Sequence, residues 1–93
     1  MLEDLTKESF LPRLNQAFRL ADAAIELRLV EVEARWGKGP KREPFSLIFL
    51  GPPEPVLAQR IYRLEHDEMG ALELFLVPIG RDAAGARYEA AFS

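Results

Sequence analysis

Cysteine is absent from this sequence, and His66 is the only histidine. Without cysteine the chain can form neither disulfides nor thiolate metal sites. No apolar run approaches the length of a membrane-spanning helix, and the N-terminus lacks the basic and apolar pattern of a signal peptide. We therefore expect a cytoplasmic protein with no membrane partner.

An excess of positive charge is also missing, because 12 Lys and Arg residues face 15 Asp and Glu residues, for a formal charge of −3. Affinity for phosphate backbones depends on such an excess, so no nucleic-acid partner is expected. A length of 93 residues and a hydrophobic content of 48% are typical of one soluble globular domain. Residues 1–93 are therefore predicted to form a single domain.

The clearest pattern in the chain is a strand over residues 71–79 that is apolar on both faces. Alternate residues of a strand point to opposite sides. The leucines at 72, 74 and 76 share one face, and the apolar residues of the other face are Phe75, Val77 and Ile79. Such a strand must be covered on both sides, either by another segment of this chain or by another molecule.

The preceding strand, residues 59–66, is predicted to pair with it as a hairpin. Gly70 ends the turn between them, because glycine takes a positive φ without a Cβ clash. The alternation of both strands fixes the register, since a slip of one residue would turn each apolar set to the wrong side. The residues predicted to lie opposite each other are Leu64 and Leu72, Tyr62 and Leu74, Arg63 and Glu73 as an ion pair, and Ile61 and Phe75. A third strand, with Tyr88, Ala90 and Phe92 on the leucine face, follows a turn over residues 80–85.

The N-terminal segment, residues 1–14, is the one stretch with helical spacing. Thr6 can cap the start of a short helix, Pro12 limits its length, and Asn15 tolerates the left-handed conformation that would end it. Because the segment is apolar, it is the first candidate to cover Phe75, Val77 and Ile79.

Residues 24–36 fit two structures. Alternation is clean up to Leu29 and resumes one residue out of phase at Val30, which predicts a long strand with a β-bulge between them. A helix would also align Ile25, Leu29, Val32 and Trp36. Two residues, Leu27 and Val30, fall off that helical stripe, so we favour the strand.

The remaining segments complete an all-antiparallel sheet over residues 16–93. Residues 16–20 form a short strand, and the apolar run Phe45–Leu50 suits a buried one. The proline-rich residues 51–55 form an extended connection, after which Val56 and Leu57 are expected to enter the core. The chain is thus predicted to be mainly β, a small antiparallel barrel or sandwich of about six strands with a short N-terminal helix.

Two groups of residues are candidates for an interaction surface. The first is the outer face of residues 71–79. The second is a basic cluster with one aromatic side chain, which could hold a phosphate or an acidic partner, although a solvated loop with the tryptophan sealing the barrel end is favoured. The residues of the cluster are Trp36, Lys38, Lys41 and Arg42.

No pattern supports catalysis, a metal or a cofactor. His66 lies among Glu65, Asp67 and Glu68, but adjacent strand residues alternate faces and cannot converge on a metal. Glu31 and Glu33 share a face and could work as a pair of carboxylates, yet a charged solvent face is favoured. We therefore predict a protein that is not an enzyme and binds no cofactor.

Several segments resemble a family of small bacterial proteins known only as a domain of unknown function. The resembling residues are Leu5-Thr6 with Phe10, Phe18-Arg19, Phe45-Ser46-Leu47, Gly51-Pro52, Pro55-Val56-Leu57, Tyr62–His66, Gly70, Leu72–Gly80 and Tyr88-Glu89-Ala90. The resemblance implies an association with phage-tail-like or tail-fibre-collar genes. It implies no activity, so no functional residue is carried over.

Taken together, these patterns favour a non-enzymatic structural or protein-interaction module that associates with itself or docks on a larger assembly. The alternative is a small-ligand-binding β-barrel with its pocket inside. Barrels of this size are usually filled by their own side chains, so the alternative is second.

Overall fold

The structure, a computed structural model, describes residues 5–34 and 44–92. A short α-helix, a turn of 3-10 helix and six strands follow one another in the described ranges. Their bounds are α1 Lys7–Phe10, η2 Leu11–Arg13, β1 Ala17–Leu20, β2 Glu26–Ala34, β3 Phe45–Gly51, β4 Arg60–His66, β5 Gly70–Asp82 and β6 Gly85–Phe92. The prediction of a mainly β fold with a short N-terminal helix is confirmed, and residues 26–34 are strand.

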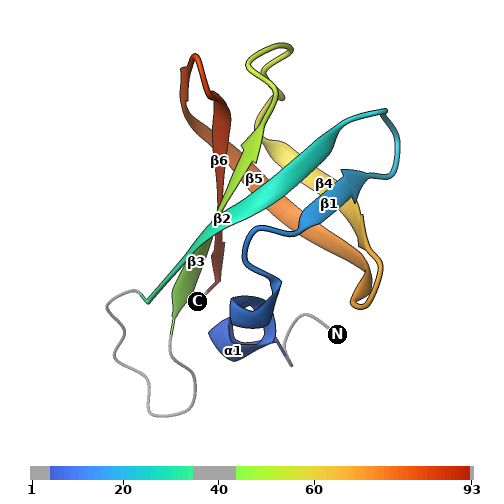
Figure 1. Cartoon of the computed structure of the whole chain (residues 1–93), viewed down its shortest axis with the longest axis vertical. Helices are drawn as coiled ribbons and strands as arrows, with labels where there is room; N and C mark the ends of the chain where they lie inside the picture. Colours follow the sequence, from blue (N-terminus) through green and yellow to red (C-terminus); the bar gives the residue numbers. More distant parts are fainter. Residues whose placement is uncertain (1–4, 35–43, 93) are drawn as a thin grey trace.

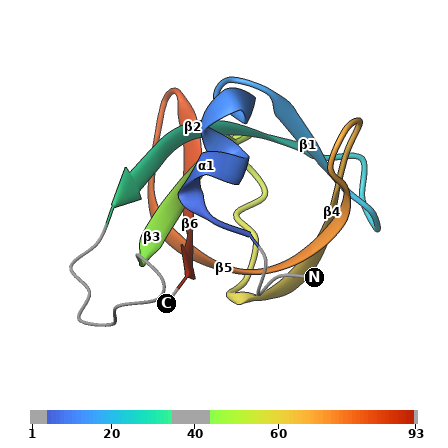
Figure 2. The same ribbon diagram turned by 90° about the horizontal axis from the view of Figure 1, so that it is seen from below.

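The strands form a closed barrel in the order β1-β2-β3-β6-β5-β4, and every neighbouring pair is antiparallel. Viewed from one end, they make a ring (Figure 2). The ring closes where the short β1 meets β4, with Arg19 opposite Glu65 and Leu20 opposite Leu64. Closure gives most strands a partner on both sides, which protects their backbone groups from other chains. Of the two predicted architectures, the barrel is therefore correct.

Apolar side chains fill the inside of the barrel. The largest side chains that are fully buried are Tyr88, Phe10, Phe18, Phe45, Phe49, Leu27, Leu29, Leu47, Leu64 and Leu76. The rings of Phe18 and Phe49 meet edge to face with centroids 5.4 Å apart. The leucine face of β5 and the aromatic face of β6 both point into this core, as their alternation predicted.

Helix α1 lies across one end of the barrel (Figures 1 and 2). The side chain of Phe10 enters that end and is fully buried, with its ring centroid 6.0 Å from that of Phe45 and 5.7 Å from that of Phe92. Thr6 precedes the helix as its N-cap, and Asn15 beyond it has a φ of 69°, the left-handed conformation predicted for it. The helix therefore plugs the barrel.

This position makes one prediction wrong. The N-terminal segment was expected to cover Phe75, Val77 and Ile79, but its buried aromatic side chain packs inside the barrel end and not on the outer face of β5. Phe75 and Ile79 are each 50% exposed. The physical reason is that a helix of four residues has one apolar face, and Phe10 commits that face to the core.

The connection between β3 and β4 lies at the opposite end of the barrel (Figure 1). The backbone N–H of Leu57 donates to the hydroxyl of Tyr88 at 2.8 Å, and the Leu57 side chain packs against the core. Val56 is 43% exposed, so the prediction that both residues enter the core is correct only for Leu57. Successive side chains of an extended segment point to opposite sides, which leaves room for one of the two.

The predicted β4–β5 register is confirmed at all four pairs, from Ile61 opposite Phe75 to Leu64 opposite Leu72. Gly70 has the expected positive φ of 78°. In β2 the pairing with β3 shifts between Leu29 and Glu31, which is the bulge that the phase slip predicted. Local alternation was thus sufficient to place the side chains of the hairpin.

Strand β5 is longer than predicted, because Gly80, Arg81 and Asp82 also pair with β6 and leave a turn of only two residues. Its first half pairs with β4 and its second half with β6. A second register shift falls between Pro78 and Gly80 and leaves Ile79 without a partner. Proline cannot donate to a ladder, and bulges are where strands tolerate it.

The turn that follows β5 is held by Asp82. Its carboxylate accepts hydrogen bonds from Arg87 at 3.0 Å and from the backbone N–H of Ala84 at 2.9 Å. The hydrogen bond from Arg87, and then that from Ala84, lower the pKa of the Asp82 carboxyl below its usual value. Arg87 is thereby engaged within its own hairpin.

Candidate interaction surface on strands β4 and β5

Four apolar side chains form a strip on the outside of strands β4 and β5. Ile61 and Phe75 lie directly opposite each other and are 60% and 50% exposed. Val77 continues the row along β5 and is half-buried, and Ile79 at the bulge is exposed. We call Ile61, Phe75, Val77 and Ile79 the outer strip. It contains three of the five large apolar side chains that are exposed in the described residues.

The outer strip is apolar because β5 has two apolar faces and the barrel can bury only one of them. The leucines of β5 point inward and are buried, so alternation directs Phe75 outward. Within residues 5–34 and 44–92, no segment covers Ile61, Phe75 or Ile79. Contiguous exposed apolar side chains on a small soluble domain are characteristic of protein–protein contact.

Next to the strip lies a pair of opposite charges that do not bond to each other. Arg63 and Glu73 are exposed and directly opposite across β4 and β5, as predicted. The predicted ion pair between Arg63 and Glu73 is not formed. The salt bridges found among residues 5–34 and 44–92 involve other residues. They join Arg13 to Glu68, Arg19 to Asp67, Arg81 to Glu54 and Arg87 to Asp82. Arg63 and Glu73 therefore border the outer strip without forming an ion pair with each other.

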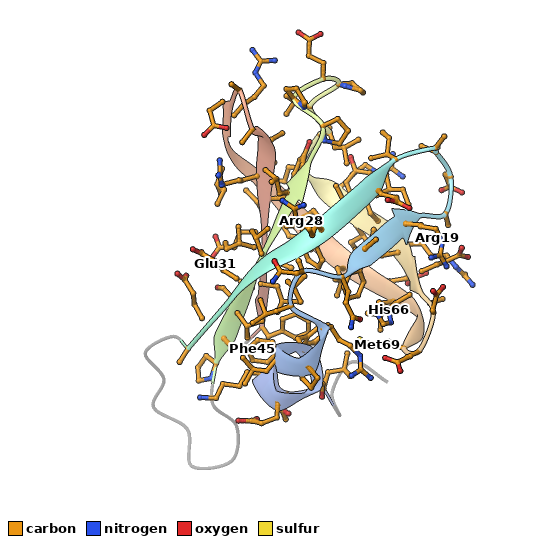
Figure 3. All side chains as sticks on the ribbon, in the orientation of Figure 1. Arg19, Arg28, Glu31, Phe45, His66 and Met69 are labelled. Atoms are coloured by element: carbon orange, nitrogen blue, oxygen red, sulfur yellow. The ribbon has the colours of Figure 1, made fainter. Side chains whose placement is uncertain are left out.

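His66 is a buried structural residue at the turn between β4 and β5 (Figure 3). Its Nδ1 accepts the backbone N–H groups of Glu68 and Met69, both at 3.1 Å. A nitrogen that accepts carries no proton, so Nε2 carries it and donates to Oε1 of Gln16 at 2.6 Å. Its ring lies 4.6 Å from that of Phe18. Both nitrogens are thus occupied, and neither is left to bind a metal or to accept a substrate proton.

Replacing His66 with alanine is expected to lower the free energy of unfolding by about 2–3 kcal/mol, since two turn N–H groups lose their acceptor and a packed ring is removed. Asparagine offers an oxygen near the position of Nδ1, so His66→Asn is expected to lose about half as much. Urea unfolding with amide exchange at Glu68 and Met69 measures this. Equal losses in both variants, with unchanged exchange of the two amides, would contradict the role assigned to Nδ1.

The other residues singled out by the sequence do not come together. Glu31 and Glu33 are exposed on the outside of β2, opposite Ile48 and Ser46 of β3 (Figure 3 labels Glu31). The basic cluster of Trp36, Lys38, Lys41 and Arg42 lies outside the described residues, so its role stays a prediction. Among the residues that are described, no group of three or more His, Asp or Glu side chains could hold a metal ion. No helix in the same ranges is long and apolar enough to cross a membrane.

Two open grooves adjoin the first residue of β2, and Glu26 and Pro52 line both of them. The larger one, of about 620 Å³, is lined by Arg19, Leu20, Ala23, Ala24, Ile25, Glu26, Pro52 and Glu65. The smaller one, of about 400 Å³, is lined by Asn15, Ala17, Glu26, Leu27, Arg28, Leu50, Gly51, Pro52 and Ala84. Arg19 is engaged in an ion pair with Asp67 at 3.1 Å. Neither groove is the interior pocket that a ligand-carrying barrel would need.

Two residues with a role in the structure were not among the residues predicted from the sequence. One belongs to the outer strip, and the other joins two neighbouring strands. Ile61 belongs to the outer strip, and the signal for it was the register that set it opposite Phe75. The buried Ser46, whose hydroxyl donates to Glu89 at 2.8 Å, links the outer sides of β3 and β6. The sequence carried no signal for this bond, because the two residues are 43 positions apart.

Fold and surface together define a small closed β-barrel with a filled interior and an exposed apolar strip. The chain belongs to the family described as Domain of unknown function (DUF6916), whose model matches residues 5–92. Comparisons with curated proteins and with solved structures each gave no match. The membership confirms the resemblance to an uncharacterised family, while the implied association with phage-tail-like genes stays a prediction.

Proposed function

We propose that the protein is a non-enzymatic structural or interaction module that binds other protein chains through the outer strip. The observation that carries the proposal is the exposed pair of Ile61 and Phe75, which lie directly opposite each other in the β4–β5 ladder. Burying the exposed part of two such side chains is favourable at roughly 25 cal/mol per Å². The closed ladder around them holds the two residues in fixed positions, so little ordering is needed on binding.

Within residues 5–34 and 44–92 no group of side chains is arranged for catalysis, which supports contact over chemistry. His66, the residue best suited to proton transfer, has both nitrogens in structural hydrogen bonds. Glu31 and Glu33 stand exposed on the outside of a strand, and neither lines the two grooves. A carboxylate pair acts in catalysis when a cleft holds it around a substrate.

The finer proposal is that the module is a cytoplasmic component of a bacterial multi-protein assembly of the phage-tail-like kind. It rests on the gene association that the resemblance implied. A small closed barrel with Phe10 buried in one end and Leu57 packed against the core at the other would keep its shape inside an assembly. The basic cluster that includes Trp36 stays a second predicted contact of the module.

Affinity purification from the native host tests the proposal with two matched variants. Phe75→Glu places a charge on the strip, and Val56→Glu places the same charge on a similarly exposed apolar residue at the barrel end. We expect the wild type and Val56→Glu to retain the same protein partners and Phe75→Glu to lose them. Equal recovery of every bound protein by all three forms would contradict the assignment of the strip.

A further inference from the structure

The outer face of the β4–β5 hairpin is complementary to itself. Ile61 lies opposite Phe75, and two residues further along Arg63 lies opposite Glu73. Each of these two levels therefore carries one member of a matching pair on β4 and the other on β5. The apolar level is exposed, and the charged level has its cation and its carboxylate free of any ion pair in the described chain.

A second copy can be placed face to face on this hairpin by a two-fold rotation. The axis runs parallel to the strands, between β4 and β5, and the two outer faces then meet in register. The rotation brings β4 of one copy onto β5 of the other at the same level. Arg63 then faces Glu73 of the second copy, and Ile61 faces its Phe75, twice each by symmetry. An axis across the strands brings β4 onto β4 instead and never sets Arg63 against Glu73. Charge complementarity therefore favours a second copy as the partner, and it favours the axis along the strands as the symmetry axis.

We propose that the chain associates with itself as a two-fold dimer through the outer face of β4 and β5. This inference rests on the proposed function and names the partner of the outer strip as a second copy. Aligned sheets pack about 10 Å apart and cross at about −30°, so contact is concentrated around the axis. The contact is smaller than a standard stable interface, and the dimer is expected to dissociate in the micromolar to millimolar range.

Charge-swapped variants test the dimer, because the proposed axis places residue 63 of one copy opposite residue 73 of the other. Arg63→Glu alone sets two glutamates against each other at both symmetric contacts, and Glu73→Arg alone sets two arginines. Each single variant is expected to weaken self-association by about tenfold or more. An equimolar mixture of the two restores both contacts in a mixed dimer. The double variant R63E/E73R restores them within one species.

Sedimentation velocity from micromolar to millimolar protein provides the readout, with a monomer mass of 10.5 kDa as reference. We expect the wild type, the mixture and the double variant to approach twice that mass as the concentration rises, while each single variant requires at least about tenfold more protein to reach the same mass. Arg28→Glu is the matched control, because it makes the same charge change on the exposed outside of β2 and is expected to dimerise like the wild type. Circular dichroism verifies that every variant is folded.

Three results would overturn the dimer. They are a wild type that stays monomeric at millimolar concentration, single variants that associate as well as the wild type, and a mixture that stays monomeric when the wild type does not. The proposed function is tested separately from the dimer. If Phe75→Glu loses a different protein in the affinity purification while the wild type is a monomer, the strip is a docking surface and its occupant is not a second copy.

Discussion

Replacing Gly85 with alanine adds only one methyl group, yet it is expected to lower the free energy of unfolding by about 4 kcal/mol or more. Gly85 begins β6 with a φ of +144°, a conformation that residues with a Cβ rarely adopt. A Cβ there would overlap the carbonyl oxygen of Gly51 and lie 3.0 Å from Cδ1 of Leu50. Because the obstacle is backbone of the neighbouring strand, it cannot turn aside as a side chain could.

Two other glycines provide the controls for this variant. Gly70 also has a positive φ, but no atom lies within 4 Å of the place that a Cβ would take, so Gly70→Ala is expected to cost about 1 kcal/mol. Gly80 has neither feature, and Gly80→Ala is expected to be close to neutral. Urea midpoints of the three variants measure the order. A Gly85→Ala protein as stable as Gly70→Ala would mean that β3 and β6 do not approach as closely as described.

Truncating Phe10 to alanine is expected to lower the free energy of unfolding by about 3–5 kcal/mol, the range for removing a fully buried aromatic ring. The ring closes the barrel end and packs against Phe45 and Phe92. For a domain of this length the total is of order 5–14 kcal/mol, so the loss is a large fraction of it. Helix α1, in which Phe10 is the buried residue, would lose that contact with the core.

The adjacent Leu11 is a control for this second variant, since it belongs to the same N-terminal segment but is 42% exposed. Leu11→Ala is expected to cost less than about 1 kcal/mol. The measurement is urea unfolding of both variants, together with proton exchange in residues 7–10. If Phe10→Ala were as stable as Leu11→Ala, helix α1 would not be the plug of the barrel.

Local patterns predicted the hairpins well. The register of β4 and β5 followed from alternation and from the turn glycine Gly70, and the bulge in β2 followed from a single phase slip at Leu29 and Val30. Both features depend on residues close in sequence, where the period of two is strict. The outer strip was located for the same reason, because Phe75 had to point away from the leucine face.

Features that depend on distant residues were not predicted. The alternation could not say whether the N-terminal segment would cover the outside of β5 or plug the barrel, since Phe10 is equally apolar in both places. The hydrogen bond between His66 and Gln16 spans 50 positions, and no pattern in the sequence marks it. The extension of β5 to Asp82 was hidden by Gly80, which has the character of a turn residue but pairs with Arg87.

The most direct test of the central claim, that the outer strip is a protein contact, is photo-crosslinking in the native host. A photoreactive aromatic amino acid is placed at position 75 and, as the control, at the similarly exposed position 56. We expect a discrete crosslinked protein band from position 75, either a second copy or another chain, and none from position 56. An uncrosslinked chain in both cases, or the same bands from both positions, would contradict the claim.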